Sequence, residues 1–114
     1  MDRERIVITG MGAVTPVGIG VKTFWENLIK GECGVGTITH FDTSDTIVKI
    51  GAQVKGFEPT NYMPKKLVRE MDVFMQYAYA SAEEALADSG IEIEPARTGI
   101  VMATAMGGSA ATAE

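Results

Sequence analysis

The feature of this sequence that most constrains its fold is a pair of short apolar runs, one near each end of the chain. Residues 5–9 read Arg-Ile-Val-Ile-Thr and stop at Gly10, and residues 99–105 read Gly-Ile-Val-Met-Ala-Thr-Ala before Gly107 and Gly108. Runs that are apolar at successive positions are typical of strands buried on both faces of a sheet. We therefore predict two buried strands, each of which needs other elements above and below it.

Apolar residues at helical spacing predict two helices between these strands. The first spans residues 21–30 and is followed by Gly31, which suits the position just after a helix. The second begins near Met71, has Asp72 to cap or charge its first turn, and ends at Gly90. The apolar face of the first helix consists of Val21, Phe24, Trp25, Leu28 and Ile29, and that of the second of Met71, Phe74, Met75, Ala78, Ala82, Ala85 and Leu86.

Residues 31–65 are the least regular part of the chain, because glycines and prolines interrupt them throughout. We predict one short strand there, within residues 46–54. The order of elements predicts an α/β fold with a mostly parallel or mixed sheet. These elements are too few to cover a strand such as residues 100–105 on both faces, which indicates that the sequence is part of something larger.

The composition excludes several classes of protein. Ten basic and fifteen acidic residues among 114 give a net charge of −5, so there is no basic excess for binding nucleic acid. Cys33 is the only cysteine, which excludes a disulfide scaffold and suits a reducing compartment. No run approaches the roughly 20 apolar residues of a membrane span, and the N-terminal run is too short for a signal peptide. We expect a cytoplasmic protein that binds neither nucleic acid nor membranes.

The pattern Gly10-x-Gly12 after a predicted strand invites comparison with dinucleotide-binding loops. That fingerprint requires a third glycine at the start of a helix, where this chain has Thr15 and Pro16. A small nucleotide-binding domain is therefore disfavoured, and a tight turn is the preferred interpretation.

Cys33 and His40 are the only cysteine and histidine of the sequence, so they are the one pair that could form a cysteine–histidine dyad. A reactive thiol needs a helix N-terminus or a cationic neighbour to stabilise its thiolate. Cys33 instead follows a predicted helix C-terminus and stands beside Glu32, so we interpret it as an ordinary loop residue. One cysteine and one histidine do not make a zinc site, and no spacing of metal ligands is present.

Two other features allow a functional interpretation. Lys65, Lys66 and Arg69 would share one face of a helix, either as a solvated surface or as a docking patch for an acidic partner. Met106 lies past the second strand and before two glycines, where its flexible side chain would leave the core and line a cavity.

Taken together, the chain resembles the N-terminal part of the β-ketoacyl-acyl carrier protein synthases, the elongating condensing enzymes with the thiolase fold. The matching motifs are VITGMG (7–12), TPVG (15–18), FWENL (24–28), GECGV (31–35), HFDTS (40–44), MDVFMQYA (71–78) and ATAMGG (103–108). The resemblance implies that residues 1–114 are an incomplete N-terminal ketosynthase domain. It would form the first part of the N-terminal half of an α-β-α-β-α layered architecture.

The resemblance also implies an activity, the decarboxylative Claisen condensation of an acyl-enzyme with malonyl-acyl carrier protein. In the family a cysteine thiolate takes the acyl chain, two histidines assist decarboxylation, and no dissociable cofactor is needed. Those three residues would follow Glu114, and Cys33 and His40 do not match them. We therefore expect residues 1–114 alone to lack condensing activity.

Two sites carry over from the family by position. Met106 matches the residue that gates the acyl pocket at the dimer interface. Lys65, Lys66 and Arg69 match the basic face that receives acyl carrier protein, although a position that is often basic there is Glu70 here. The implied partners are acyl carrier protein and a second copy of the full-length protein.

Three alternatives remain open from the sequence. The chain would also fit a truncated, non-catalytic module that docks a carrier protein, or a fragment of a polyketide ketosynthase. A plant protein of this family would work in the plastid stroma rather than in a cytoplasm.

Overall fold

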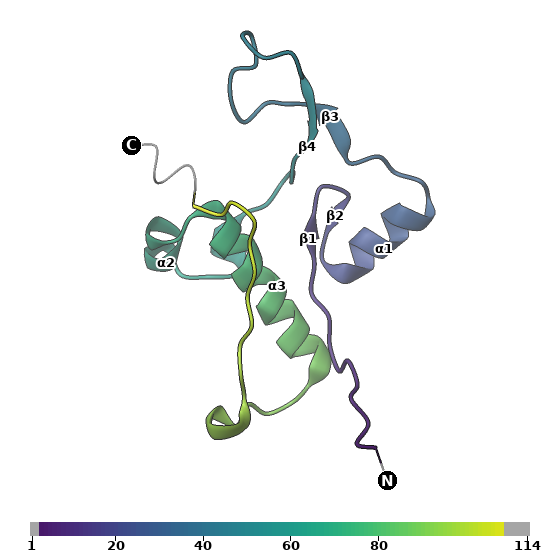
Figure 1. The fold of residues 1–114 in the computed structure, drawn as a ribbon, viewed down its shortest axis with the longest axis vertical. Coiled ribbons are helices and arrows are strands. Elements are labelled where there is room, and N and C mark those ends of the chain that lie inside the picture. The colour runs from purple at the N-terminus through teal and green to yellow at the C-terminus, as the bar shows by residue number, and fades with distance from the viewer. Residues whose placement is uncertain (1–2, 109–114) are drawn as a thin grey trace.

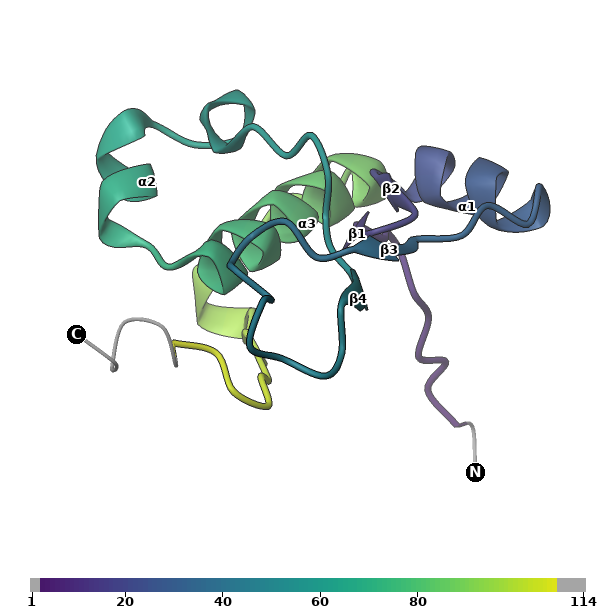
Figure 2. The same cartoon turned by 90° about the horizontal axis from the view of Figure 1, so that it is seen from above.

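A single long helix, α3 (Val73–Ser89), organises the chain, and the shorter elements lie around it (Figure 1). This computed structural model describes residues 3–108. In chain order the elements are β1 (Val14–Thr15), β2 (Gly18–Ile19), α1 (Val21–Ile29), β3 (Val35–Thr37), β4 (Ile50–Ala52), α2 (Lys65–Glu70) and α3, with single-turn 3-10 helices at Pro59–Asn61 and Pro95–Arg97. Seen from above, α1 and α2 lie near opposite ends of α3 (Figure 2).

Helix α1 confirms the helix predicted over residues 21–30. Its C-terminus is closed by two main-chain hydrogen bonds, from Gly31 N to Leu28 O and from Glu32 N to Asn27 O, each 3.0 Å long. Gly31 has a φ of 75°, and this left-handed conformation, which glycine adopts without steric cost, allows the chain to turn there.

Helix α3 confirms the second predicted helix and both of its predicted ends. Asp72 precedes the helix and its side chain accepts a hydrogen bond from Val73 N. Gly90 ends it in the left-handed conformation, with its N–H bonded to Leu86 O. The local sequence therefore determines where this helix starts and stops.

Strands β1 and β2 form a small antiparallel hairpin around Pro16 and Val17. The Thr15 hydroxyl closes this turn, since its Oγ1 accepts from Val17 N and Gly18 N and donates to Gly18 O. The Thr-Pro-Val-Gly sequence thus encodes its own turn.

Strands β3 and β4 form a second antiparallel pair, in which Gly36 lies opposite Gly51. β4 falls inside the strand predicted within residues 46–54, whereas β3 lies in a region that the sequence indicated to be irregular. Within residues 3–108 every strand pairing is antiparallel, so the mostly parallel sheet expected from the sequence is not formed there.

The strands predicted at residues 5–9 and 99–105 are also not formed in the described part of the chain. Both segments lack a strand partner. Gly10 and Gly12, which follow the first segment, approach α3 at Ser81 and Ala85, whereas the second segment runs alongside an adjacent part of the helix (Figure 1). A strand requires a neighbouring main chain to complete its hydrogen bonds, and neither segment has one here.

Burial is low throughout the described residues. Met63 and Ala80 are the buried apolar side chains, while Ile6 and Val101 are 98% and 95% exposed. The radius of gyration is 17.2 Å, compared with about 13 Å for a compact domain of this length. The described elements therefore leave much apolar surface uncovered.

Across residues 3–108, no helix combines the length and apolar character needed to cross a bilayer.

Candidate functional site

The basic cluster predicted from the sequence lies on α2, one turn before α3. Lys65, Lys66 and Arg69 are all exposed, and Leu67 and Val68 between them are half-buried. Among residues 3–108, the one ion pair joins Arg97 and Glu94 at 3.6 Å. None of the three cations of α2 therefore takes part in a salt bridge within these residues. The helix therefore presents three positive charges to solvent in an acidic chain.

Glu58 is the acidic group with an electrostatic link to this cluster. Hydrogen bonds from the Thr60 hydroxyl and main-chain N–H lower the pKa of Glu58, and the nearby charge of Lys65 adds a smaller lowering. Glu58 therefore remains ionised beside the N-terminal end of α2 and offsets part of its positive charge.

The joint between α2 and α3 contains a residue that sequence reasoning missed. Gln76 is only 7% exposed, and its Nε2 donates to Val68 O at 3.0 Å and to Met71 O at 2.9 Å. No signal in the sequence marks it, because Gln76 lies off the apolar face predicted for this helix, on the side that lines a cavity with Tyr77. A polar residue at such a position is buried only if it finds hydrogen-bond partners.

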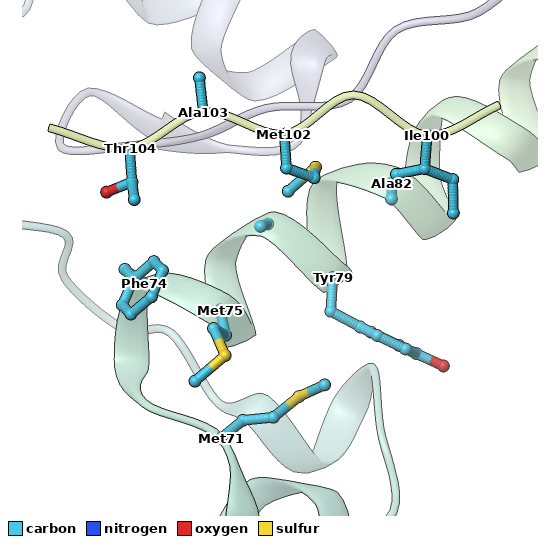
Figure 3. Close-up of a pocket in the computed structure, with 10 residues that line it drawn as sticks. Met71, Phe74, Met75, Tyr79, Ala82, Ile100, Met102, Ala103 and Thr104 are labelled. Atoms are coloured by element: carbon cyan, nitrogen blue, oxygen red, sulfur yellow. The ribbon is translucent and has the colours of Figure 1, made fainter. Parts of the chain in front are cut away.

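An apolar groove of about 550 Å³ lies between α3 and the extended segment 99–105 (Figure 3). Side chains from both elements point into it. Its lining consists of Met71, Phe74, Met75, Ala78, Tyr79, Ala82, Ile100, Met102, Ala103 and Thr104. Most of the residues predicted to form the buried stripe of α3 thus face this groove.

Met106 lies in a turn beside this groove, and its side chain is 78% exposed rather than part of the lining. The turn is held by a hydrogen bond of 2.9 Å from Gly107 N to Thr104 Oγ1. The backbone at Gly107 packs against Phe74, because a Cβ placed there would lie 2.6 Å from the Phe74 ring. Any larger residue at this point of contact would have to displace the Phe74 ring or the Thr104 hydroxyl.

The structure does not bring Cys33 and His40 into one site. His40 lines a second cavity, of about 430 Å³, with Phe57, Gln76 and Tyr77 among its walls, and Cys33 is not part of that lining. Cys33 is exposed, and its Sγ has the carbonyl oxygen of Val35 as its hydrogen-bond partner. These positions supply no base for the thiol.

Tyr77 is one of the aromatic residues that line this second cavity. Its ring packs edge-on against Phe57 at a centroid distance of 4.9 Å, and Phe57 stacks on Tyr62 at 5.4 Å. Partial burial raises the pKa of the Tyr77 hydroxyl above 10.0. This cluster anchors the segment before α2 to the side of α3.

The Gly10-x-Gly12 segment packs on α3 instead of forming an open loop. A Cβ at Gly12 would lie 1.8 Å from Ser81 O. The N–H groups of Met11 and Ala13 donate to the carboxylates of Asp88 and Glu84, at 3.0 and 2.9 Å. Since side chains of α3 occupy these donors, they are not available to a phosphate.

The described residues also contain no cluster of three or more histidine, cysteine, aspartate or glutamate side chains that would hold a metal ion.

Comparison with known proteins agrees with the sequence motifs along the chain. The chain is 41% identical over 111 residues to 3-oxoacyl-[acyl-carrier-protein] synthase 2 of Vibrio cholerae, covering 95% of this chain and 27% of that protein. It is 40% identical to the synthase 2 of Coxiella burnetii, with the same coverage, and 41% identical over 110 residues to that of Staphylococcus aureus, with coverages of 94% and 27%. The chain therefore spans about a quarter of the length of these relatives.

A solved structure gives the same assignment of the fold. The ishigamide ketosynthase/chain length factor matches with a TM-score of 0.67 and 32% identity, over 75% of this chain and 21% of the other. The α/β elements described above are thus a partial thiolase-like fold. The family model described as "Beta-ketoacyl synthase, N-terminal domain" matches residues 3–114. The chain therefore belongs to the β-ketoacyl synthase family, and it matches the N-terminal domain of that family.

Proposed function

We propose that this chain is the N-terminal part of a 3-oxoacyl-acyl carrier protein synthase, an acyltransferase of fatty acid synthesis. The observation that carries the proposal is the 41% identity to synthases of that name over nearly all of the chain. Residues 1–114 would then be an incomplete ketosynthase domain, and the complete protein would be a cytoplasmic homodimer.

The proposed reaction is a condensation with loss of carbon dioxide. A cysteine thiolate of the complete enzyme takes the acyl group from its carrier protein thioester, and a histidine pair assists decarboxylation of the malonyl thioester. The carbanion so formed attacks the acyl-enzyme and releases the cysteine thiolate. Cys33 does not serve as this nucleophile, because it is exposed and follows the C-terminus of α1. The chain by itself would not perform the condensation.

The partner of α2 in this proposal is the acyl carrier protein, which is acidic. Lys65, Lys66 and Arg69 are exposed and would attract the carrier before contact and orient it after contact. Glu70 ends the same helix and weakens the field at that end. This role accounts for a positive helix in a chain with a net charge of −5.

Met106 is the proposed gate of the acyl pocket. Its side chain is free of the groove between α3 and residues 99–105, and its turn is anchored by Gly107 against Phe74. An unbranched, flexible side chain on an anchored turn is suited to move while the backbone stays fixed.

Polyketide synthesis is the second candidate, because a ketosynthase/chain length factor shares the fold at 32% identity. Both candidates use the same condensation, so the product distinguishes them. The protein that carries this chain should be incubated with acyl- and malonyl-carrier protein, and the release of carbon dioxide measured along with the products. Because this mixture contains no reductase, a product that stops at one β-ketoacyl condensation indicates fatty acid synthesis, and accumulation of poly-β-ketone chains indicates the second candidate. Absence of condensation would contradict both.

The docking role has its own test. Reversing the charge of Lys66 and Arg69 to glutamate should slow association with the carrier protein, and the difference from the unchanged protein should shrink as salt is added. Stopped-flow association at several ionic strengths measures this. The matched control is Lys22→Glu together with Lys30→Glu, which changes the net charge equally but at the two ends of α1. Equal association rates for the two double variants would show that α2 is not part of the docking site.

A further inference from the structure

Helix α2 is too short to hold its own position. It has six residues, no side-chain cap at Pro64, and carbonyl groups at its C-terminus that lack partners within the helix. Helices of this length are not stable in isolation. Contacts from outside α2 must therefore determine where its three cations point.

Gln76 supplies such a contact from the first turns of α3. Leu67 O is already bonded to Met71 N at 2.9 Å, and the next carbonyl, Val68 O, receives its hydrogen bond from Gln76 Nε2. The second proton of the same amide goes to Met71 O, within the joint that links the two helices. One side chain thus binds both the last turn of α2 and the joint that follows it.

The aromatic cluster of Phe57, Tyr62 and Tyr77 holds the segment before α2 against α3, whereas Gln76 acts on the joint that follows α2. Met71 and Asp72 are both in extended conformation, with φ values of −106° and −66°. Asp72 caps α3 and not α2, since its carboxylate accepts from Val73 N. Without the Gln76 amide, the C-terminal end of α2 would lose the two hydrogen bonds that tie it to α3 and could shift by rotation in these two residues.

We infer that Gln76 is a positioning residue for carrier protein docking: it sets the angle of α2, and with it the placement of Lys65, Lys66 and Arg69. This inference rests on the docking role proposed for α2. Gln76 itself is buried and does not touch the carrier. Its action is to keep the charged face of α2 in a fixed place relative to the body of the protein, so that less ordering is required on binding.

The test is Gln76→Met in the complete synthase, with two kinds of malonyl substrate. Methionine keeps the unbranched apolar shape and removes both donors. The KM for malonyl-carrier protein should rise on the order of tenfold, the effect of losing about one buried hydrogen bond. Turnover of malonyl-pantetheine, a thioester without the carrier protein, should stay unchanged. A residue needed only for stability would lower the activity with both substrates.

The matched control is Gln53→Met, because Gln53 is the other glutamine of the chain and lies just after β4, outside α2 and α3. It should change neither KM. If Gln76→Met does not fold, Gln76→Asn replaces it. Asparagine keeps the amide but is one methylene too short to reach both carbonyls, so the same selective rise in KM is expected at smaller size.

Two outcomes would overturn the inference, and they separate it from the proposed function. If Lys66→Glu raises the KM for malonyl-carrier protein and Gln76→Met does not, the docking role stands and the positioning role of Gln76 is wrong. If neither variant raises it, the docking role of α2 is wrong as well. Equal losses with both malonyl substrates in Gln76→Met would likewise reject the positioning role.

Discussion

The carboxylate of Glu84 on α3 binds the first residue of α1, Val21, across 63 positions of sequence. Its Oε1 accepts from Val21 N at 2.8 Å, and its Oε2 accepts from Ala13 N at 2.9 Å. The residue before α1 is Gly20, with a φ of 85° and no side chain to cap the helix. Glu84 therefore supplies from α3 the N-terminal cap that α1 lacks, and a negative charge is favourable at that helix end.

We expect Glu84→Gln to destabilise the chain by about 1–3 kcal/mol, because an amide has one acceptor oxygen for two donors and turns its own NH2 group toward one of them. Trp25, the single tryptophan, lies on α1 and reports on the release of this helix by fluorescence. Urea unfolding followed at Trp25 measures the change. Glu83→Gln, at the exposed neighbouring position, is the control, and an equal effect of both variants would contradict the cap.

Gly12→Ala should be among the most damaging single substitutions in the chain. The added Cβ would lie 1.8 Å from Ser81 O, and a backbone atom of α3 cannot move aside as a side chain can. We expect a loss of about 3 kcal/mol or more, measured by chemical denaturation. Gly99→Ala is the control, since a Cβ at Gly99 meets no atom within 4 Å; similar losses at both sites would refute the steric argument.

Stability should fall at alkaline pH because of Tyr77. Burial raises the pKa of its hydroxyl above 10.0 in the folded chain, so the unfolded chain loses this proton first as the pH rises. The contribution is complete below pH 10 and is lost as the pH rises through the folded-state pKa. Unfolding free energies at about pH 8 and about pH 10.5 should differ less in Tyr77→Phe than in the unchanged chain. An identical pH dependence would exclude Tyr77 as the cause.

Met106→Ala should change which acyl lengths the complete synthase accepts. A methyl group in place of the longer side chain leaves the proposed gate open, so discrimination between short and long acyl chains should weaken. The distribution of product lengths, measured by mass spectrometry, tests this. Met11→Ala replaces another exposed methionine outside the groove and should leave the distribution unchanged. An unaltered distribution in Met106→Ala would show that Met106 does not gate the acyl pocket.

The two main helices could be predicted because their signals are local. The apolar spacing of α1 and α3, together with Gly31, Asp72 and Gly90, determines both elements within a few turns of sequence. The exposure of the cations of α2 was also predictable, since Lys65, Lys66 and Arg69 share one face of a helix that starts after Pro64. These features depend on neighbours three or four residues away.

The parts that the sequence did not predict depend on distant neighbours. Residues 5–9 and 99–105 have the composition of strands, but a strand forms only against another main chain, and none lies beside them within residues 3–108. The hydrogen bonds of Gln76 and Glu84 were equally hidden, because nothing in a single sequence marks a polar side chain as the cap of another element. The roles proposed for Lys66 and Met106 come from the family resemblance, because periodicity alone does not suggest them.

The contacts between the start of the chain and α3 also determine when the N-terminal segment can fold during synthesis. Met11 and Ala13 are bonded to side chains 77 and 71 positions later, so the N-terminal segment leaves the ribosome well before its partners exist. At about 5–20 residues per second, that interval lasts roughly 4–15 s. During it the N–H groups of Met11 and Ala13 lack their carboxylate partners, so this segment cannot take up its place against α3 until that helix has been synthesised.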